Sequence, residues 1–139
     1  MTTQMTGKVA VVTGGSSGIG FATAEAFLRE GARVAICGRS QETLDTAASE
    51  LARVAGPDQV FACTCDVLEE EAVQAFATSV GDRFGRCDAL VCNAGQARTS
   101  NFSNTSDQDW RDEFELKFFL YCARCGPSSI CLKAQALAP

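Results

Sequence analysis

The feature that most constrains the fold is a repeated alternation of short apolar runs with longer amphipathic stretches. The runs show no polar alternation, so each predicts a parallel strand covered on both faces, and they are Val9–Val12, Val34–Cys37, Val60–Cys63 and Ala89–Cys92. The stretches predict helices, and they are Ile19–Glu30, Gln41–Val54, Glu69–Phe84 and Asp107–Ala123. Strands that alternate with helices form right-handed βαβ units on a parallel sheet. We therefore expect an α/β fold of about four strands and four helices.

Local signals also mark the faces and ends of the helices. In the third stretch, apolar residues recur every four positions on one side, at Ala72, Phe76, Val80 and Phe84. Gly31 and Gly56 follow the first two stretches, where a glycine commonly ends a helix. Residues 122–139 have neither a helical nor a strand period. We expect one domain over residues 1–121 and an irregular tail over residues 122–139.

Composition argues against several classes of function. Hydrophobic residues make up 46% of the chain and charged residues 21%, a balance typical of a globular domain. The net charge of -5, without a basic stripe, argues against a nucleic-acid partner. No apolar run approaches the roughly 20 residues that span a bilayer, and Met1–Lys8 has no apolar signal-peptide core. We therefore expect a cytoplasmic protein without a membrane partner.

The eight cysteines are read as free thiols, and the chain has no histidine. Cys37, Cys63 and Cys92 fall in the apolar runs, where a reduced thiol behaves as a small hydrophobic side chain. Cys63-Thr-Cys65 and Cys122-Ala-Arg-Cys125 leave a metal module as an alternative. One CxxC pair without histidine or a second well-spaced pair is a weak zinc signal, so we expect no metal site.

The strongest chemical signal is the turn Thr13-Gly-Gly-Ser-Ser-Gly-Ile-Gly20, between the first strand and the first helix. Its glycines predict a tight turn at Gly14, close approach of a pyrophosphate at Gly18 and close helix packing at Gly20. The N-terminus of the helix would offer N–H groups and its positive dipole end to phosphate. A plain Gly/Ser loop is the alternative, but the position after the first strand favours nucleotide binding. The residues expected to contact the cofactor here are Gly14, Ser16, Ser17, Gly18, Ile19 and Gly20.

The end of the second strand indicates which dinucleotide the fold prefers. A carboxylate at this position accepts hydrogen bonds from the 2′-hydroxyl of NAD and repels the extra phosphate of NADP. Here Gly38 is followed by Arg39 and Ser40, so a guanidinium is available to pair with a dianionic phosphate. The alternative is a solvated Arg39 and a Ser40 that only caps the next helix. We predict a Rossmann-like, doubly wound domain that prefers NADP(H) to NAD(H).

These residues together resemble the short-chain dehydrogenase/reductase family, over roughly Gly7 to Phe119. The turn matches the family's TGxxxGxG form, and Trp110 stands where many members carry a tryptophan. Asp66 and Val67, after the third strand, resemble an acidic-apolar pair whose aspartate contacts the adenine amino group. For Asp66 alone, the alternative is a helix cap.

A second motif of the resemblance follows the fourth strand. Asn93, Ala94 and Gly95 match the NAG motif, which supports the central sheet beside the cofactor ribose. Taken alone, they are equally consistent with a plain turn. The resemblance implies an NADP(H)-dependent oxidoreductase that passes hydride between the nicotinamide and a small carbonyl or alcohol substrate.

The sequence departs from the family where catalytic residues are expected. The resemblance implies an asparagine where Lys117 stands, then a later serine and a tyrosine–lysine pair four residues apart. The only tyrosine is Tyr121, and position 125 is Cys125. We therefore predict a truncated, inactive form without the catalytic serine, tyrosine and lysine, with a non-catalytic protein that binds NADP(H) or a partner as the alternative. The sequence predicts neither a substrate nor an oligomeric state.

The tail suggests a hypothesis about the reading frame. Back-translated and read in another frame, Cys122–Pro139 permits LRALRPFFNLLESASAGS, which resembles the RAxxP ending of the family's fourth helix. The recovered segment falls roughly one helical turn early. A shifted frame would therefore also require a small deletion.

Overall fold

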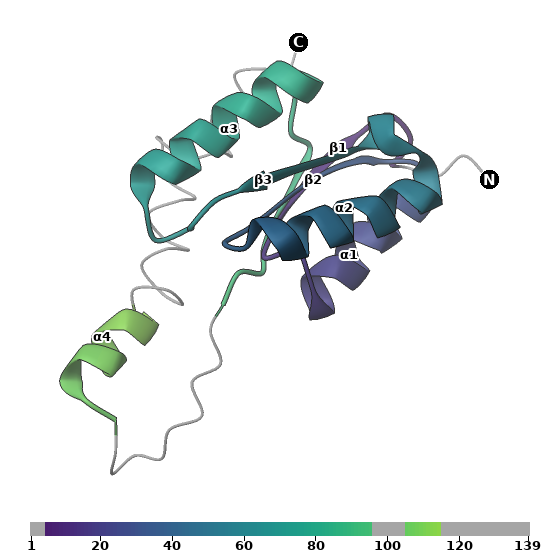
Figure 1. Ribbon diagram of the computed structural model, residues 1–139. Helices are drawn as coiled ribbons and strands as arrows, with labels where there is room; N and C mark the ends of the chain where they lie inside the picture. Colours follow the sequence, from purple (N-terminus) through teal and green to yellow (C-terminus); the bar gives the residue numbers. More distant parts are fainter. Residues whose placement is uncertain (1–4, 96–104, 115–139) are drawn as a thin grey trace.

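Strands and helices alternate along the chain in the computed structural model, which describes residues 5–95 and 105–114 (Figure 1). The strands are β1 (Val9–Thr13), β2 (Arg33–Gly38), β3 (Val60–Thr64) and β4 (Ala89–Cys92). The helices are α1 (Gly18–Arg29), α2 (Gln41–Ala55), α3 (Glu70–Phe84) and α4 (Asp107–Phe114), with a short 3₁₀ helix, η1, at Pro57–Gln59. The alternation predicted from the apolar runs is confirmed, and η1 is an addition that the sequence pattern did not predict.

The strands form one parallel sheet in the order β3-β2-β1-β4. The chain moves outward from β1 through β2 and β3, and then returns to add β4 on the other side of β1. At the carboxyl end of β1, Thr13 is paired with Cys37 of β2 and with Cys92 of β4. The predicted α/β, Rossmann-like parallel architecture is confirmed. Open sheets of this kind bind ligands outside the carboxyl ends of the strands, where the strand order reverses.

Helices cover both faces of the sheet, which explains why the strands are apolar along their length. Helices α1 and α2 lie on one face and α3 lies on the other (Figure 1). Ala10 and Val12 pack in the core on the α1–α2 side, whereas Val9 and Val11 pack in the core on the α3 side. All four side chains are fully buried. A strand between two helical layers buries its side chains in both directions.

The helix faces and ends follow the local signals. Helix α3 buries Phe76, Val80 and Phe84 as predicted. The fourth predicted residue, Ala72, is only partly buried, and Val73 is buried in addition. Helix α1 ends at Arg29 with Glu30 as its C-cap, and Gly31 follows. Helix α2 has Arg53 in its last turn, and Gly56 is its C-cap. None of the described helices combines the length and hydropathy needed to cross a membrane.

Helix α4 begins with a reciprocal cap. Ser106 Oγ donates to Asp109 Oδ2 at 2.6 Å, and the Asp109 N–H lies 3.2 Å from Ser106 Oγ. The described helix ends at Phe114. The predicted continuation to residue 123, together with Lys117 and the tail 122–139, lies outside the described residues.

An ionic cluster at the amino ends of the strands joins β1 to β4. Asp88 Oδ2 accepts hydrogen bonds from the Val9 N–H and from Arg86 Nε, each at 2.8 Å, and Lys8 Nζ lies 3.7 Å from Asp88 Oδ1. Burial disfavours the charged carboxylate, but the hydrogen bonds from Arg86 and Val9 and the charges of Arg86 and Lys8 lower the pKa of Asp88. The cluster therefore holds the start of β4 against the start of β1 in its charged state.

Candidate functional site

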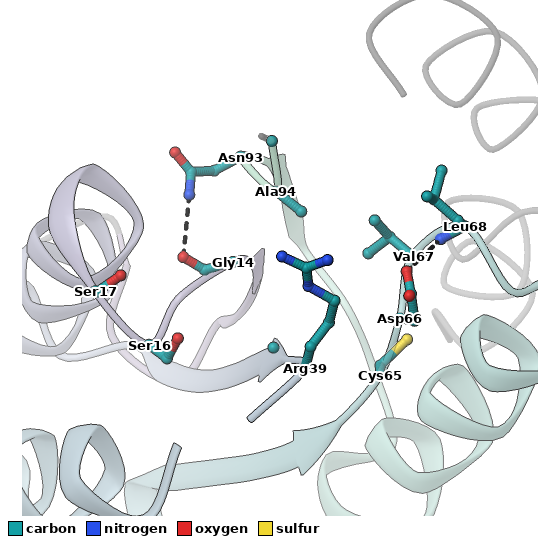
Figure 2. Close-up of a pocket in the computed structure, with 12 residues that line it drawn as sticks. Gly14, Ser16, Ser17, Arg39, Cys65, Asp66, Val67, Leu68, Asn93 and Ala94 are labelled. Atoms are coloured by element: carbon teal, nitrogen blue, oxygen red, sulfur yellow. Dashed lines mark hydrogen bonds between the residues drawn. The ribbon is translucent and has the colours of Figure 1, made fainter. Parts of the chain in front are cut away.

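A cavity of about 280 Å³ opens at the carboxyl ends of the strands (Figure 2). Its walls are the glycine turn after β1, the end of β2, and the loops after β3 and β4. The predicted cofactor residues that line it are Gly14, Ser16, Ser17, Arg39, Asp66, Val67, Asn93, Ala94 and Gly95. Four other predicted residues are outside the lining, and they are Gly18, Ile19, Gly20 and Ser40. The cavity also includes Gly38, Cys65 and Leu68.

The glycines of the turn are required for two different physical reasons. Gly14 and Gly18 have φ angles of +66° and +56°, a left-handed conformation that side chains rarely adopt. A Cβ atom on Gly18 would meet no atom within 4 Å, so the space beside it is open to a ligand. A Cβ atom on Gly20 would instead collide with the carbonyl oxygen of Gly14 and with Asn93 Nδ2. Gly20 therefore permits close packing as predicted, but its nearest neighbours are the turn itself and the loop after β4.

Asn93 holds the glycine turn against the end of β4. Its side-chain Nδ2 donates to the Gly14 carbonyl oxygen at 3.1 Å (Figure 2). The same nitrogen donates to the Thr13 carbonyl oxygen at 3.2 Å. Thr13 Oγ1 accepts hydrogen bonds from the backbone N–H groups of Asn93 at 3.0 Å and Ala94 at 3.1 Å. The Asn93–Gly95 segment is therefore more than a plain turn, because it fixes the shape of the glycine turn, Thr13–Gly20, which we name the phosphate turn after its predicted ligand.

The N-terminus of α1 lies at the cavity. Its N-cap, Ser17, is extended and lines the cavity, and in the described structure its side chain makes no capping hydrogen bond. The first turn of α1 contains no acidic residue. The first N–H groups of a helix have no partner within the helix, and they carry the positive end of its dipole. This end of α1 is suited to bind a phosphate.

The end of β2 places one cation at the cavity and no acid. Figure 2 shows the Arg39 side chain extending from β2 into the space between Ala94 and the Asp66–Val67 segment. A Cβ atom on Gly38 would lie 3.2 Å from Ser16 Oγ, so a larger residue here would press on the serine. Ser40 is the N-cap of α2, and its Oγ accepts a hydrogen bond from the Thr43 N–H at 3.4 Å. Ser40 therefore caps α2, as the alternative prediction proposed.

Asp66 shapes the loop after β3. Its Oδ1 accepts a hydrogen bond from the Leu68 N–H at 3.0 Å, and the N-cap of α3 is Glu69. The alternative of Asp66 as the helix cap is therefore wrong. Val67 and the half-exposed Leu68 add apolar surface to the same wall, opposite the glycine turn (Figure 2).

Several residues of the site were not among those predicted to contact the cofactor. A Cβ atom on Gly15 would lie 2.6 Å from Ile36 Cγ2, so this glycine lets the turn pack against β2. Cys65 is buried, lines the cavity and interacts with the Cys37 thiol. The hydrogen bond to Cys65, and then burial, raise the pKa of the Cys37 thiol far above its ordinary value. Only the β2–β3 register, which pairs Cys37 with Cys63, could have suggested that these thiols meet.

The arrangement suits a ligand with phosphate at one end and an apolar ring at the other. The helix N-terminus and the glycine turn would offer N–H groups to a phosphate, Arg39 provides a cation, and Val67 with Leu68 provides apolar contact. Among residues 5–95 and 105–114, no cluster of three or more cysteine or acidic side chains is arranged to hold a metal ion.

Comparisons with known proteins give a consistent result. The family model described as short chain dehydrogenase matches residues 8–125. D-threitol dehydrogenase from Mycolicibacterium smegmatis is 40% identical over 126 residues, which cover 88% of this chain and 48% of that protein. The chain therefore spans about half the length of the curated relatives it matches.

Solved structures show the same relation. The NADPH-bound short chain oxidoreductase from Pseudomonas aeruginosa PAO1, which contains an atypical catalytic center, is 45% identical with a TM-score of 0.77. The match covers 85% of this chain and 46% of that one. L-sorbose reductase from Gluconobacter frateurii, solved with NADPH and L-sorbose, is 38% identical with a TM-score of 0.79, and the match covers 88% of this chain and 46% of that one.

Proposed function

The chain belongs to the short-chain dehydrogenase family of oxidoreductases, and we propose that its cavity binds NADP(H) in preference to NAD(H). The observation that carries this proposal is Arg39, which extends into the cavity beside Gly38, where NAD-specific folds place a carboxylate. A guanidinium pairs with a dianionic phosphate, and glycine removes the charge that would repel it. The bound NADPH of the two structural relatives supports this choice.

The residues present fit the rest of the dinucleotide. The open space beside Gly18 and the N-terminus of α1 suit the pyrophosphate. Asp66 and Val67, on the opposite wall, suit the adenine ring, and Asn93–Gly95 lies at the carboxyl end of β4, where the resemblance puts the ribose. When bound, the cofactor would supply hydride, and the residues described here would bind and orient it.

For the chemistry, we propose that an intact enzyme of this family type, with its catalytic residues present, exchanges hydride with a small carbonyl or alcohol substrate. Two of the named relatives, a D-threitol dehydrogenase and an L-sorbose reductase, support this class of substrate. The 139 residues themselves contain one tyrosine, Tyr121, with Cys125 four residues later. We therefore propose that this polypeptide alone binds NADP(H) without turnover. The absence of a lysine four residues after Tyr121 favours the second candidate, a non-catalytic protein that binds NADP(H).

The test is a titration of the 139-residue chain with NADPH and with NADH, followed by cofactor fluorescence. Arg39→Ala should weaken NADPH binding, because it removes a charge-assisted hydrogen bond worth about 1.5–3 kcal/mol. Arg39 is exposed, so solvent screening favours the lower end, or a loss of about tenfold in affinity. NADH binding should stay nearly unchanged.

The matched control is Arg53→Ala. Arg53 is exposed in the last turn of α2 and does not line the cavity, so this variant loses the same charge elsewhere. Equal losses for NADPH and NADH in Arg39→Ala would contradict the assignment. An NADPH loss in Arg53→Ala as large as in Arg39→Ala would show that only net charge matters.

A further inference from the structure

Three cysteines gather where β2 and β3 end at the wall of the cavity. Cys37 is the fifth residue of β2 and is paired in register with Cys63 of β3. Cys65 follows β3, and its N–H donates to the Gly38 carbonyl oxygen at 2.9 Å. All three belong to the core on the α3 side of the sheet, and all are free thiols. The function proposed above gives them no task.

Two of the three thiols are in direct contact. The Cys37 thiol forms a hydrogen bond with the Cys65 thiol, and it also receives a hydrogen bond from the backbone of Gly14 in the phosphate turn. Cys37 is fully buried, whereas Cys65 contributes to the cavity lining. Cys65, which keeps 4% of its surface exposed, is therefore the member of the pair closer to the cavity.

We propose that Cys37 and Cys65 are a redox modification site, at which a peroxide closes a disulfide bond in the wall of the cofactor cavity. This inference rests on the proposed function only for its effect on NADP(H). A hydroperoxide is small enough to enter a cavity of about 280 Å³, since roughly 10–15 Å³ of such space already holds a water molecule.

The chemistry balances in two steps. The Cys65 sulfur attacks one oxygen of hydrogen peroxide, the O–O bond breaks, and water leaves as Cys65 becomes a sulfenic acid. The Cys37 sulfur then attacks the Cys65 sulfur, the S–O bond breaks, and a second water leaves as the S–S bond forms. Two thiols are oxidised to one disulfide, and one peroxide is reduced to two waters. The raised pKa of Cys37 keeps this thiol protonated and so makes the step slow.

Disulfide formation and cofactor binding should oppose each other. A bound dinucleotide fills the cavity and blocks the approach of peroxide to Cys65. A disulfide bond is about 2.05 Å long, so its formation draws the end of β2 toward the loop after β3. Cys37 precedes Gly38 and Arg39 and contacts Gly14, so this movement shifts the walls that would hold the phosphates. Linkage requires the two effects to be reciprocal.

The experiment treats the full chain with hydrogen peroxide, with and without NADP⁺, and maps all eight cysteines by differential alkylation and peptide mass spectrometry. We expect a Cys37–Cys65 cross-link that dithiothreitol reverses. NADP⁺ at ten times its Kd leaves about one chain in eleven free, so the cross-link should form about tenfold more slowly. After removal of peroxide, NADPH affinity should be reduced by about tenfold, within the usual range of coupling between sites.

Variants separate this pair from the other cysteines. Cys65→Ser should abolish the cross-link, and Cys37→Ala should do so as well if the serine variant folds poorly. Cys63→Ser is the matched control, because Cys63 points its Sγ at the Thr64 carbonyl oxygen (3.5 Å) and is outside the cavity lining, and it should form the cross-link at the wild-type rate.

Three outcomes would overturn the proposal: a cross-link that joins other cysteines, a rate that NADP⁺ leaves unchanged, or an oxidised chain that binds NADPH as well as the reduced chain. A reduced chain that binds no NADPH would refute the proposed function instead. In that case, the mapped cross-link would still decide whether the Cys37–Cys65 site exists.

Discussion

The two glycines that end the phosphate turn should fail in different ways when each is changed to alanine. In Gly20→Ala, the new methyl group collides with the Gly14 carbonyl oxygen and with Asn93 Nδ2, which belong to the fold itself. In Gly18→Ala, the methyl group meets no protein atom within 4 Å but enters the space proposed for the pyrophosphate. We expect Gly20→Ala to lose both stability and cofactor binding, and Gly18→Ala to lose mainly binding.

The magnitudes follow from these contacts. Overpacking costs typically 1–3 kcal/mol, and a collision with backbone supports the upper value, about 3 kcal/mol. Gly20→Ala also loses the Asn93–Gly14 hydrogen bond, about 1 kcal/mol, but gains about 1 kcal/mol in helix propensity. The free energy of unfolding should therefore fall by about 3 kcal/mol. In Gly18→Ala, a left-handed alanine costs about 1–2 kcal/mol, and lower entropy of the unfolded chain offsets about 0.4–1 kcal/mol, which leaves a loss of about 0–1.6 kcal/mol.

The assay combines urea unfolding with NADPH titration of each folded variant. Gly7→Ala is the matched control, because Gly7 also has a positive φ, +74°, with nothing within 4 Å of an added Cβ, but it precedes β1 at the amino ends of the strands, away from the carboxyl ends where the phosphate would bind. It should lose about as much stability as Gly18→Ala and keep wild-type NADPH affinity. If Gly18→Ala binds NADPH as well as Gly7→Ala, or if Gly20→Ala is as stable as wild type, the reasoning is refuted.

Three further predictions follow from the structure. Hydrogen bonds and positive charges lower the pKa of Asp88, so the stabilisation that its carboxylate provides should be complete at neutral pH and be lost as the pH falls below about 4. Asp88→Asn should lower the free energy of unfolding by about 1 kcal/mol at pH 7. In urea titrations at several pH values, the same variant should show a weaker loss of stability in acid than wild type. Strand β4 is an edge of the sheet formed by the described residues, so the 139-residue chain should self-associate in gel filtration at micromolar concentration, and a sharp monomer peak would contradict this. Purified chain should not oxidise NADPH with ketones, aldehydes or quinones, because loss of general acid catalysis lowers the turnover rate by about 10²–10⁴-fold. Turnover that co-purifies with the chain and disappears in Gly18→Trp would contradict this prediction.

The local features of the fold could be predicted from the sequence because their causes are local. Each predicted strand is present, and each is extended by no more than a residue at either end, because a short apolar run bounded by turn residues is typical of a strand buried on both faces. Helix α1 begins at Gly18, one residue before the predicted Ile19, and Gly18 has a left-handed φ of +56°. The predicted turn, Arg39, Asp66–Val67 and Asn93–Gly95 meet at one cavity because the carboxyl ends of parallel strands share an edge.

What could not be predicted depends on strand register. The packing of Gly15 against Ile36 requires knowledge of how β1 lies against β2. The contact between Cys37 and Cys65 likewise depends on the β2–β3 pairing, and the chain spacing of the two cysteines gives no hint of it. The bonds from Asn93 to Thr13 and Gly14 join residues about 80 positions apart, and the motif alone did not show that the side chain was the link.

The two halves of the cavity are therefore constrained unequally. The glycine turn is bonded to the end of β4 through Thr13 and Asn93, so a change there alters the fold and the site together. Arg39 and Gly38, which we propose select the cofactor, lie at the end of β2, and neither takes part in those bonds. A Cβ atom on Gly38 would meet only the Ser16 hydroxyl and the Leu44 side chain at 3.2 Å or more. We therefore propose that substitution of Arg39 changes cofactor preference without loss of the phosphate turn, because Arg39 takes no part in those bonds.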